Sequence, residues 1–181
     1  MPPIISLLER AMKKKVVITL CLLIILCNFL SAEEGITGFW KSISDETGKT
    51  QTITAIYEYN GQLFGRIIVT FDEEGYPKDT IDTPAERTTA LLGNPFYAGL
   101  DFIWNLTEKG NKWTRGKILD PQQGRLYSCE MWLEDENLIV RGQILFFGRN
   151  QTWCRVNPSD LPPGFHLPDY SRFRPSIPSI K

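Results

Sequence analysis

The dipeptide Asn60-Gly61 constrains the fold most strongly, because it joins two stretches in which apolar residues recur at every second position. Such alternation over residues 50–59, and again over 62–71, is typical of β-strands with one buried face. Asn and Gly take the positive φ angles that a two-residue hairpin connection requires. The sequence therefore predicts two antiparallel strands, 50–59 and 62–71, joined by a tight turn.

Six further segments have the same strand-like character and are separated by turn sequences such as Asp120-Pro121 and Gly148-Arg149-Asn150. These segments are 36–43, 100–106, 112–119, 125–133, 138–147 and 151–156. Eight short strands at hairpin spacing indicate an all-β sandwich or barrel. Eight antiparallel up-and-down strands can close into a barrel whose interior is either filled or holds one small ligand.

Residues 72–99 interrupt the strand pattern. Within them, Thr83-Pro84-Ala85-Glu86 has the form of a capping box with proline at the first helical position, and Gly93 suits a helix end. We therefore expect one short helix over residues 84–92. It lies in a loop long enough to act as a lid over a binding site.

The N-terminal residues follow the order of a secretory signal peptide. Basic residues 13–15 precede an apolar run over 16–30, and the small residues Ser31 and Ala32 come next. The run is shorter than the roughly 20 residues that span a bilayer, which favours cleavage over a membrane anchor. We expect a signal peptide over residues 1–32.

Two alternatives concern this N-terminal segment. Translation starts at Met1 or at Met12, since the basic residues follow Met12 directly. A lipid anchor at Cys27 is less favoured than ordinary cleavage, because the preceding Leu26 is not a small residue. In either case we expect a periplasmic or secreted protein without a stable membrane span.

The charge of the chain argues against a nucleic-acid partner. Without residues 1–32, 16 basic and 20 acidic residues remain, which gives a net charge of −4. Nucleic-acid-binding proteins carry a basic footprint that this chain lacks. No basic tract remains that would bind anionic lipid.

Two cysteines, Cys129 and Cys154, remain in a compartment that permits disulfides. Both fall in predicted strands. Geometry decides whether they form a disulfide or stay as two buried thiols.

The inventory of reactive side chains argues against an enzyme. The only histidine, His166, lies in a proline-rich segment, and carboxylate clusters such as Asp72-Glu73-Glu74 lie in turns or in the long loop. No CxxC motif or Cys/His cluster is present, so we expect no zinc site. We expect no cofactor either, because no glycine-rich phosphate loop precedes a helix.

The last segment, residues 158–181, contains six of the twelve prolines and cannot continue a sheet. It is either an extended segment laid on the barrel and held by Phe165, Tyr170 and Phe173, or a partly disordered extension. The predicted organisation is therefore a barrel domain over residues 33–157 followed by an irregular C-terminal extension.

The first and last strands of an eight-stranded barrel are neighbours, so Arg155 could stack over the indole of Trp40. Such a cation–π contact contributes on the order of 0.5–2 kcal/mol, which would help to close the barrel. Arg149 is expected in the preceding hairpin turn. The pattern Gly38-x-Trp40 with a C-terminal arginine resembles the lipocalin and fatty-acid-binding superfamily.

Four motifs in order resemble the bacterial secreted family known as domain of unknown function 2147, over about residues 36–156. They are Gly38-Phe39-Trp40, Asp120-Pro121-x-x-Gly124-x-x-Tyr127, Val140-Arg141-Gly142 and Gly148-Arg149-x-Gln151-Thr152-Trp153-x-Arg155. The segment from Asp79 to Leu100 is longer than is usual in that family, and the C-terminal extension is an addition. The resemblance implies a lipocalin-like barrel in the periplasm, without an established activity.

We consider two functions. In the first, the barrel binds a small apolar or lipid-like ligand, and Arg141 pairs with a ligand carboxylate or phosphate; otherwise Arg141 pairs internally and aromatic residues fill the barrel. The candidate residues of the cavity or its mouth are Tyr57, Tyr59, Trp104, Trp113, Tyr127, Met131 and Arg141. In the second, a filled barrel contacts a protein of the cell envelope through its extension or an exposed aromatic patch.

Overall fold

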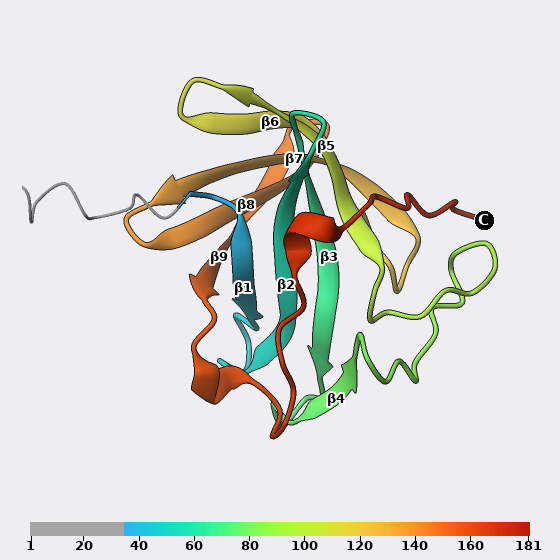
Figure 1. The fold of residues 1–181 in the computed structure, drawn as a ribbon. Coiled ribbons are helices and arrows are strands. Elements are labelled where there is room, and N and C mark those ends of the chain that lie inside the picture. Colours follow the sequence, from blue (N-terminus) through green and yellow to red (C-terminus); the bar gives the residue numbers. More distant parts are fainter. Residues whose placement is uncertain (1–34) are drawn as a thin grey trace, which may run out of the picture. The chain divides into compact units, whose positions relative to one another are not determined.

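The computed structural model describes residues 35–181, which are drawn in colour in Figure 1. The predicted signal peptide, residues 1–32, and Cys27 lie outside the described residues. The described residues form β-strands and two short 3-10 turns, η1 (Pro158–Asp160) and η2 (Tyr170–Arg172). In this part of the chain, no helix is long and apolar enough to cross a membrane.

Eight strands form a closed antiparallel barrel in which neighbours in the ring follow one another along the chain. They are β1 (Gly38–Ile43), β2 (Thr50–Tyr59), β3 (Gln62–Phe71), β5 (Asp101–Lys109), β6 (Lys112–Asp120), β7 (Arg125–Glu134), β8 (Asn137–Ile144) and β9 (Phe147–Arg155). The short strand β4 (Pro77–Thr80) pairs only with β3, outside the ring. The prediction of an eight-stranded up-and-down barrel is confirmed.

The hairpin β2–β3 has the predicted strand bounds and the predicted turn. Tyr59 and Gln62 are the last paired residues, and the two residues between them, Asn60 and Gly61, have φ angles of 52° and 74°. Both angles are positive, as a type I′ turn requires. The alternation of the flanking strands and the turn chemistry therefore specify the same hairpin.

The barrel closes where β1 pairs with β9, and Trp40 faces Arg155 across this seam. The guanidinium carbon of Arg155 lies 3.9 Å from the centre of the Trp40 ring, and its Nη1 donates to the Thr37 carbonyl at 3.2 Å. Gly38 has a φ of 130°, and a Cβ there would lie 2.7 Å from Arg155 Nη1. Glycine is needed at this position because the arginine occupies the space of a side chain.

Strands β2 and β3 are buried on both faces. Their inner faces contribute to the core inside the barrel, whereas a second cluster of Ile53, Ala55, Ile68 and Val69 lies apart from it. Phe165, Tyr170 and Phe173 of the C-terminal extension pack against this second cluster. The extension, red in Figure 1, runs along the outside of β2. It is thus laid on the barrel.

The predicted helix over residues 84–92 does not form, so that prediction is wrong. Asp79 in β4 is 2% exposed and accepts hydrogen bonds from the amides of Ala85 (2.6 Å) and Glu86 (3.3 Å). In the predicted capping box, the Glu86 amide would instead donate to the side chain of Thr83. Leu91 forms a bridge with Ile180 of the extension. Tertiary contacts have overridden the local helix signal.

The turn between β8 and β9 lies at Leu145-Phe146, because Ile144 pairs with Phe147. The predicted turn at Gly148-Arg149-Asn150 is therefore wrong, and Arg149 is a strand residue. A Cβ on Gly148 would lie 2.8 Å from Nη2 of Arg141 on the neighbouring strand. The glycine makes room for this side chain and does not form the turn.

Cys129 and Cys154 are free thiols. Cys129 lies on β7 opposite Gly142 of β8, whereas Cys154 lies on β9 opposite Lys41 of β1. Strand β8 separates β7 from β9, so the pair exceeds the Cα separation of about 7 Å that a disulfide tolerates. Of the two alternatives for these cysteines, the structure has the unpaired thiols.

Candidate functional site

The barrel contains a cavity of about 920 Å³ near the end where β1, β3, β6 and β8 terminate. Its apolar lining comes mainly from Ile67, Phe102, Ile118, Val140 and Trp153. The rings of Phe102 and Trp153 stack with centroids 6.3 Å apart. Because opposite strands contribute these side chains, the apolar surface surrounds the space and does not form a single wall.

Hydroxyl groups from β1, β2 and β3 line one side of the cavity. Ser42 and Thr52 share a hydrogen bond of 2.8 Å, and both line the cavity. Thr70 lines it as well, and its Oγ1 is buried without a hydrogen-bond partner. A buried hydroxyl without a partner is costly. Polar side chains therefore lie beside the apolar lining on this side of the cavity.

Charged residues surround the cavity, and two of its cations are held in ion pairs. Lys78 pairs with Glu86 at 2.7 Å, and the hydrogen bond that Lys78 donates to this carboxylate raises the pKa of Lys78. Arg149 pairs with Asp45. The described lining residues include three cations and five acids; the cations are Lys49, Lys78 and Arg149, and the acids are Glu46, Asp72, Glu73, Glu86 and Asp120. The lining is therefore net negative.

Of the seven residues predicted for the cavity or its mouth, Tyr127 is the one that lines it. Trp104 and Met131 are buried in the core, at 7% and 0% exposure, without reaching the cavity. Trp113 is half-buried against the same core. These three aromatic and thioether side chains fill the barrel beyond the cavity.

Arg141 does not point into the cavity. Its neighbours Val140 and Gly142 both contribute to the lining, and successive side chains of a strand point to opposite faces. The Arg141 guanidinium instead donates to Oδ1 of Asn150 at 3.3 Å on the outside of the barrel. The hypothesis that Arg141 binds a ligand carboxylate or phosphate inside the barrel is therefore wrong.

Tyr57 and Tyr59 lie under the C-terminal extension and not in the cavity. Tyr57 is 1% exposed, and its ring meets that of Phe173 edge-on at 5.4 Å. Arg174 lies over the ring of Tyr59, at 5.2 Å from its centre. Alternation with polar residues predicts that both tyrosines face the interior, but the face that they share is buried by the extension.

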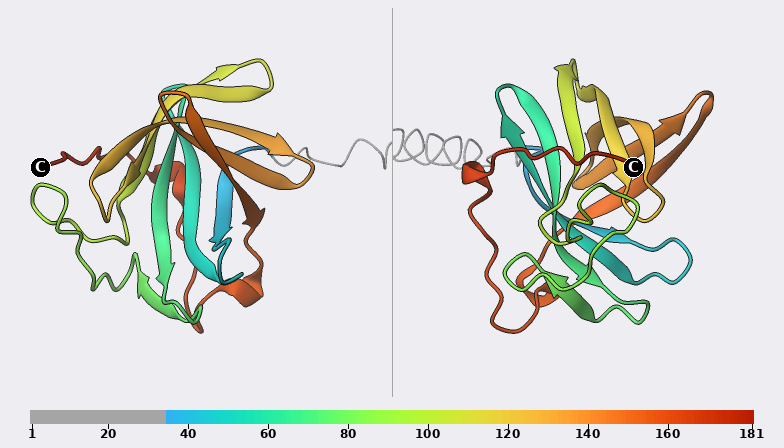
Figure 2. Two further views of the ribbon diagram at one scale, coloured as in Figure 1. Left: turned by 180° about the vertical axis from the view of Figure 1, so that it is seen from behind. Right: turned by 90° about the vertical axis from the view of Figure 1, so that its right-hand side faces the viewer.

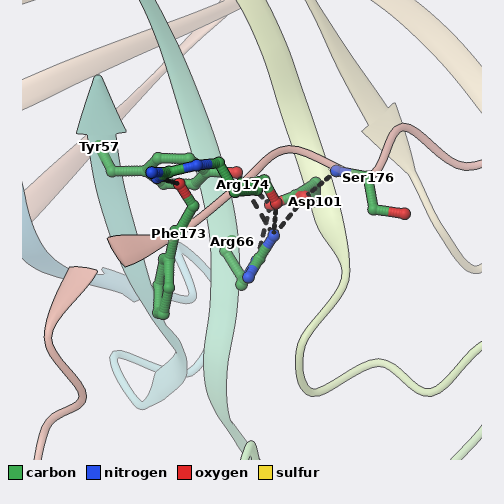
Figure 3. A network of polar contacts seen from close by, with 6 residues as sticks. All are labelled: Tyr57, Arg66, Asp101, Phe173, Arg174 and Ser176. Atoms are coloured by element: carbon green, nitrogen blue, oxygen red, sulfur yellow. Dashed lines mark hydrogen bonds and ion pairs between the residues drawn. The ribbon is translucent and has the colours of Figure 1, made fainter. Parts of the chain in front are cut away.

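A buried ion pair fastens the extension to the barrel (Figure 3). Arg66 donates from Nε and Nη2 to the two oxygens of Asp101, at 2.8 and 2.7 Å. The Tyr57 hydroxyl donates to Asp101 at 2.8 Å, and the Ser176 amide donates to it at 2.6 Å. Burial and the adjacent Asp101 carboxylate raise the pKa of Tyr57. Arg66 also donates to the Arg174 carbonyl at 2.7 Å.

Sequence reasoning missed both this network and the hydroxyl side of the cavity. The signals were present: Arg66 and Asp101 each interrupt an apolar strand, and the two positions turn out to be paired between β3 and β5. Ser42, Thr52 and Thr70 are polar residues at strand positions that face the cavity. The described residues contain no group of three or more His, Cys, Asp or Glu placed to hold a metal ion.

Comparisons with known proteins agree with this architecture. One similar solved structure is described as "Protein HP1028 from the human pathogen Helicobacter pylori belongs to the lipocalin family"; it has 16% sequence identity and a TM-score of 0.56 over 70% of this chain and 86% of that one. At this identity the likeness concerns the fold alone. No curated protein matches the chain significantly.

The sequence pattern of one protein family spans residues 38–155, which cover the barrel from the first residue of β1 to the last residue of β9. The extension lies outside the matched residues. The family is described as "Uncharacterized protein conserved in bacteria (DUF2147)". The chain belongs to this family, and its fold is a lipocalin-like barrel.

Proposed function

We propose that the protein binds a small amphipathic molecule, with an apolar body and a neutral polar end, inside its barrel. The observation that carries this proposal is the cavity of about 920 Å³ with an apolar lining from opposite strands. Ligand sites typically enclose about 300–1,000 Å³ and combine a mostly apolar lining with a few polar groups. The hydroxyls of Ser42, Thr52 and Thr70 supply such polar groups.

The charges around the cavity favour a neutral polar end over a carboxylate or phosphate. The cations of Lys78 and Arg149 are already paired with Glu86 and Asp45, and the lining contains more acids than bases. An anion placed there meets a net repulsion. A lipid-like molecule with hydroxyl or amide groups avoids that repulsion and can hydrogen-bond the threonine and serine side chains.

We propose a periplasmic or secreted location for this activity. The support is the signal-peptide pattern of residues 1–32. A carrier of apolar molecules is useful in an aqueous compartment because its ligand is poorly soluble there. Fractionation of cells that express the full chain, with N-terminal sequencing of the product, tests the location and the cleavage after Ala32.

Gly142 offers a way to fill the cavity without straining the backbone. It lines the cavity, and an added Cβ would meet Ile118 and Tyr127 at ordinary contact distances of 3.7 and 4.0 Å. Gly142→Phe should therefore occupy part of the space that a ligand needs. Gly142→Ala is the matched control, since it adds one methyl group at the same place.

The test measures fluorescence of the neutral apolar probe N-phenyl-1-naphthylamine with the chain from residue 33 onward. We expect the original protein and Gly142→Ala to bind the probe, and Gly142→Phe to bind it at least about tenfold more weakly. Native mass spectrometry after expression should show a co-purified small molecule that is lost in Gly142→Phe. Equal probe binding by all three proteins, or no binding by the original one, would contradict the proposal.

A further inference from the structure

The hairpin β8–β9 ends in a run of exposed apolar side chains. Leu145, Phe146 and Phe147 are 81%, 93% and 84% exposed, and Ile144 is 43% exposed. Figure 2, in its right-hand view, shows this orange hairpin projecting from the barrel. Single exposed apolar residues are ordinary, but four in sequence on a projecting tip indicate a surface that meets an apolar environment.

The turn itself goes against the local rules for a hairpin. Two-residue connections favour Asn and Gly because a positive φ is needed, and the chain uses Asn60-Gly61 in this way in the β2–β3 turn. At the tip of β8–β9 the two turn residues are Leu145 and Phe146, and Leu145 has a φ of 53°. A turn whose residues go against the local preference, and that gains no packing contacts in return, is expected at a functional position.

The size of the tip favours a lipid bilayer over a second protein. Its four side chains present on the order of 600 Å² of apolar surface, less than the roughly 800 Å² that each partner gives to a standard protein interface. The tip is convex and has no side-chain hydrogen-bonding group. A bilayer needs neither a complementary shape nor hydrogen bonds to accept such a tip.

The charges next to the tip also suit a membrane surface. Residues 138–155 contain three arginines and no acidic residue. Arg141 and Arg149 lie three to four residues from the turn, roughly 10 Å along the strands. This matches the depth at which headgroups lie when an apolar segment is buried about 5–10 Å into the interface. Arg149 is paired with Asp45, so apolar insertion and not charge dominates the attraction.

We infer that residues 144–147 insert into a phospholipid bilayer and hold the open end of the barrel against the membrane. Gly142 and Arg149, just behind the tip, both line the cavity. A tip buried in the lipid would therefore place the cavity next to the source of an apolar ligand. Membrane contact itself does not require that the cavity be occupied, so this inference stands apart from the ligand proposal.

The test uses the chain from residue 33 onward and flotation with vesicles of phosphatidylcholine containing phosphatidylglycerol. The variant Leu145→Gly/Phe146→Asn removes the apolar tip and places glycine at the turn residue that has a positive φ, so thermal stability should be unchanged or higher. Vesicle binding should fall by at least about tenfold. Leu92→Asn is the matched control, because Leu92 is 59% exposed and lies in the loop between β4 and β5.

Indole emission and sedimentation distinguish insertion into a membrane from contact with a second protein. Phe146→Trp should give an additional indole emission that shifts to the blue with vesicles and is quenched by brominated lipid. The inference is overturned if the original protein does not float with vesicles, or if the tip variant floats equally well. It is also overturned if sedimentation shows a dimer that the tip variant abolishes while vesicle binding is absent, since the tip is then a protein interface.

Discussion

The carboxylate of Asp101 accepts four hydrogen bonds although its side chain is fully buried. Two come from Arg66, one from the Tyr57 hydroxyl and one from the Ser176 amide. A buried ion pair adds little net stability relative to an apolar pair, but removal of one partner leaves the other charge buried alone. Asp101 is therefore the side chain on which both the barrel wall and the extension depend.

We predict that Asp101→Asn lowers the free energy of unfolding by about 3–5 kcal/mol, because it leaves the Arg66 guanidinium without its counter-ion. Urea denaturation followed by tryptophan fluorescence measures the loss. Asp169→Asn is the matched control: Asp169 is a solvent-exposed carboxylate that pairs with Arg172 three residues away, so we expect little change. Equal stability of the two variants would show that the buried network is not a structural anchor.

The buried thiol of Cys129 makes the stability of the folded protein depend on pH in the alkaline range. Burial raises the pKa of its thiol from 9.0 to about 12 in the folded protein. The unfolded chain then loses the proton at lower pH than the folded one, so stability falls as the pH rises from about 9 to 12, by up to about 1.4 kcal/mol per pH unit. We predict a flatter decline in this window for Cys129→Ala than for Cys154→Ala, as measured by urea denaturation at stepped pH. Parallel curves would contradict this origin of the pH dependence.

The places of single side chains are harder to predict from the sequence than the strands or the fold. The contact between Arg155 and Trp40 is an exception, since chain order alone predicts it: a closed ring makes the first and last strands neighbours. The sequence predicts Tyr57 in the cavity, yet Tyr57 faces the extension. Alternation shows that a strand has an apolar face, but it does not show whether the barrel interior or another segment covers that face.

The strands can be predicted from the sequence because apolar residues alternate along each of them. The bounds of β2 and β3 follow from alternation around Asn60-Gly61. The segment over residues 84–92 was not predictable in this way, since Asp79 takes the amides of Ala85 and Glu86. The β8–β9 turn was missed for a related reason: Gly148 makes room for Arg141, while Leu145 and Phe146 form the turn without any turn signal.

The C-terminal extension acts as a structural element of the barrel even though it has little regular structure. Phe173 meets Tyr57 at 5.4 Å and lies beneath the guanidinium of Arg66 at 4.5 Å. We predict that Phe173→Ala lowers the free energy of unfolding by about 1–3 kcal/mol and raises binding of an apolar dye to the newly exposed outer face. Phe146→Ala, at a site 93% exposed, should leave thermal stability unchanged. Equal melting temperatures for both variants would mean that the extension is dispensable.

At the scale of the whole molecule, we propose that the distribution of charge selects among amphiphilic ligands of the cavity. Residues 33–181 are net acidic, with 16 basic and 20 acidic residues, and the cavity lining has five acids and three cations. Two ligands with the same acyl chain would make the same apolar contacts with the cavity. The headgroup therefore carries the difference in affinity between a neutral ligand and an anionic one.

Monoolein and oleate test this difference, because they share one acyl chain and differ in the polar end. We predict that the protein prefers monoolein at low salt and that the preference shrinks as salt screens the lining charges. Glu46→Gln/Glu73→Gln removes two lining acids outside both ion pairs. It should strengthen oleate binding roughly fivefold, the equivalent of about 1 kcal/mol, and leave monoolein unchanged. Displacement of N-phenyl-1-naphthylamine gives both affinities. A protein that prefers oleate, or a double variant that changes both ligands equally, would show that the charges around the cavity do not select the headgroup.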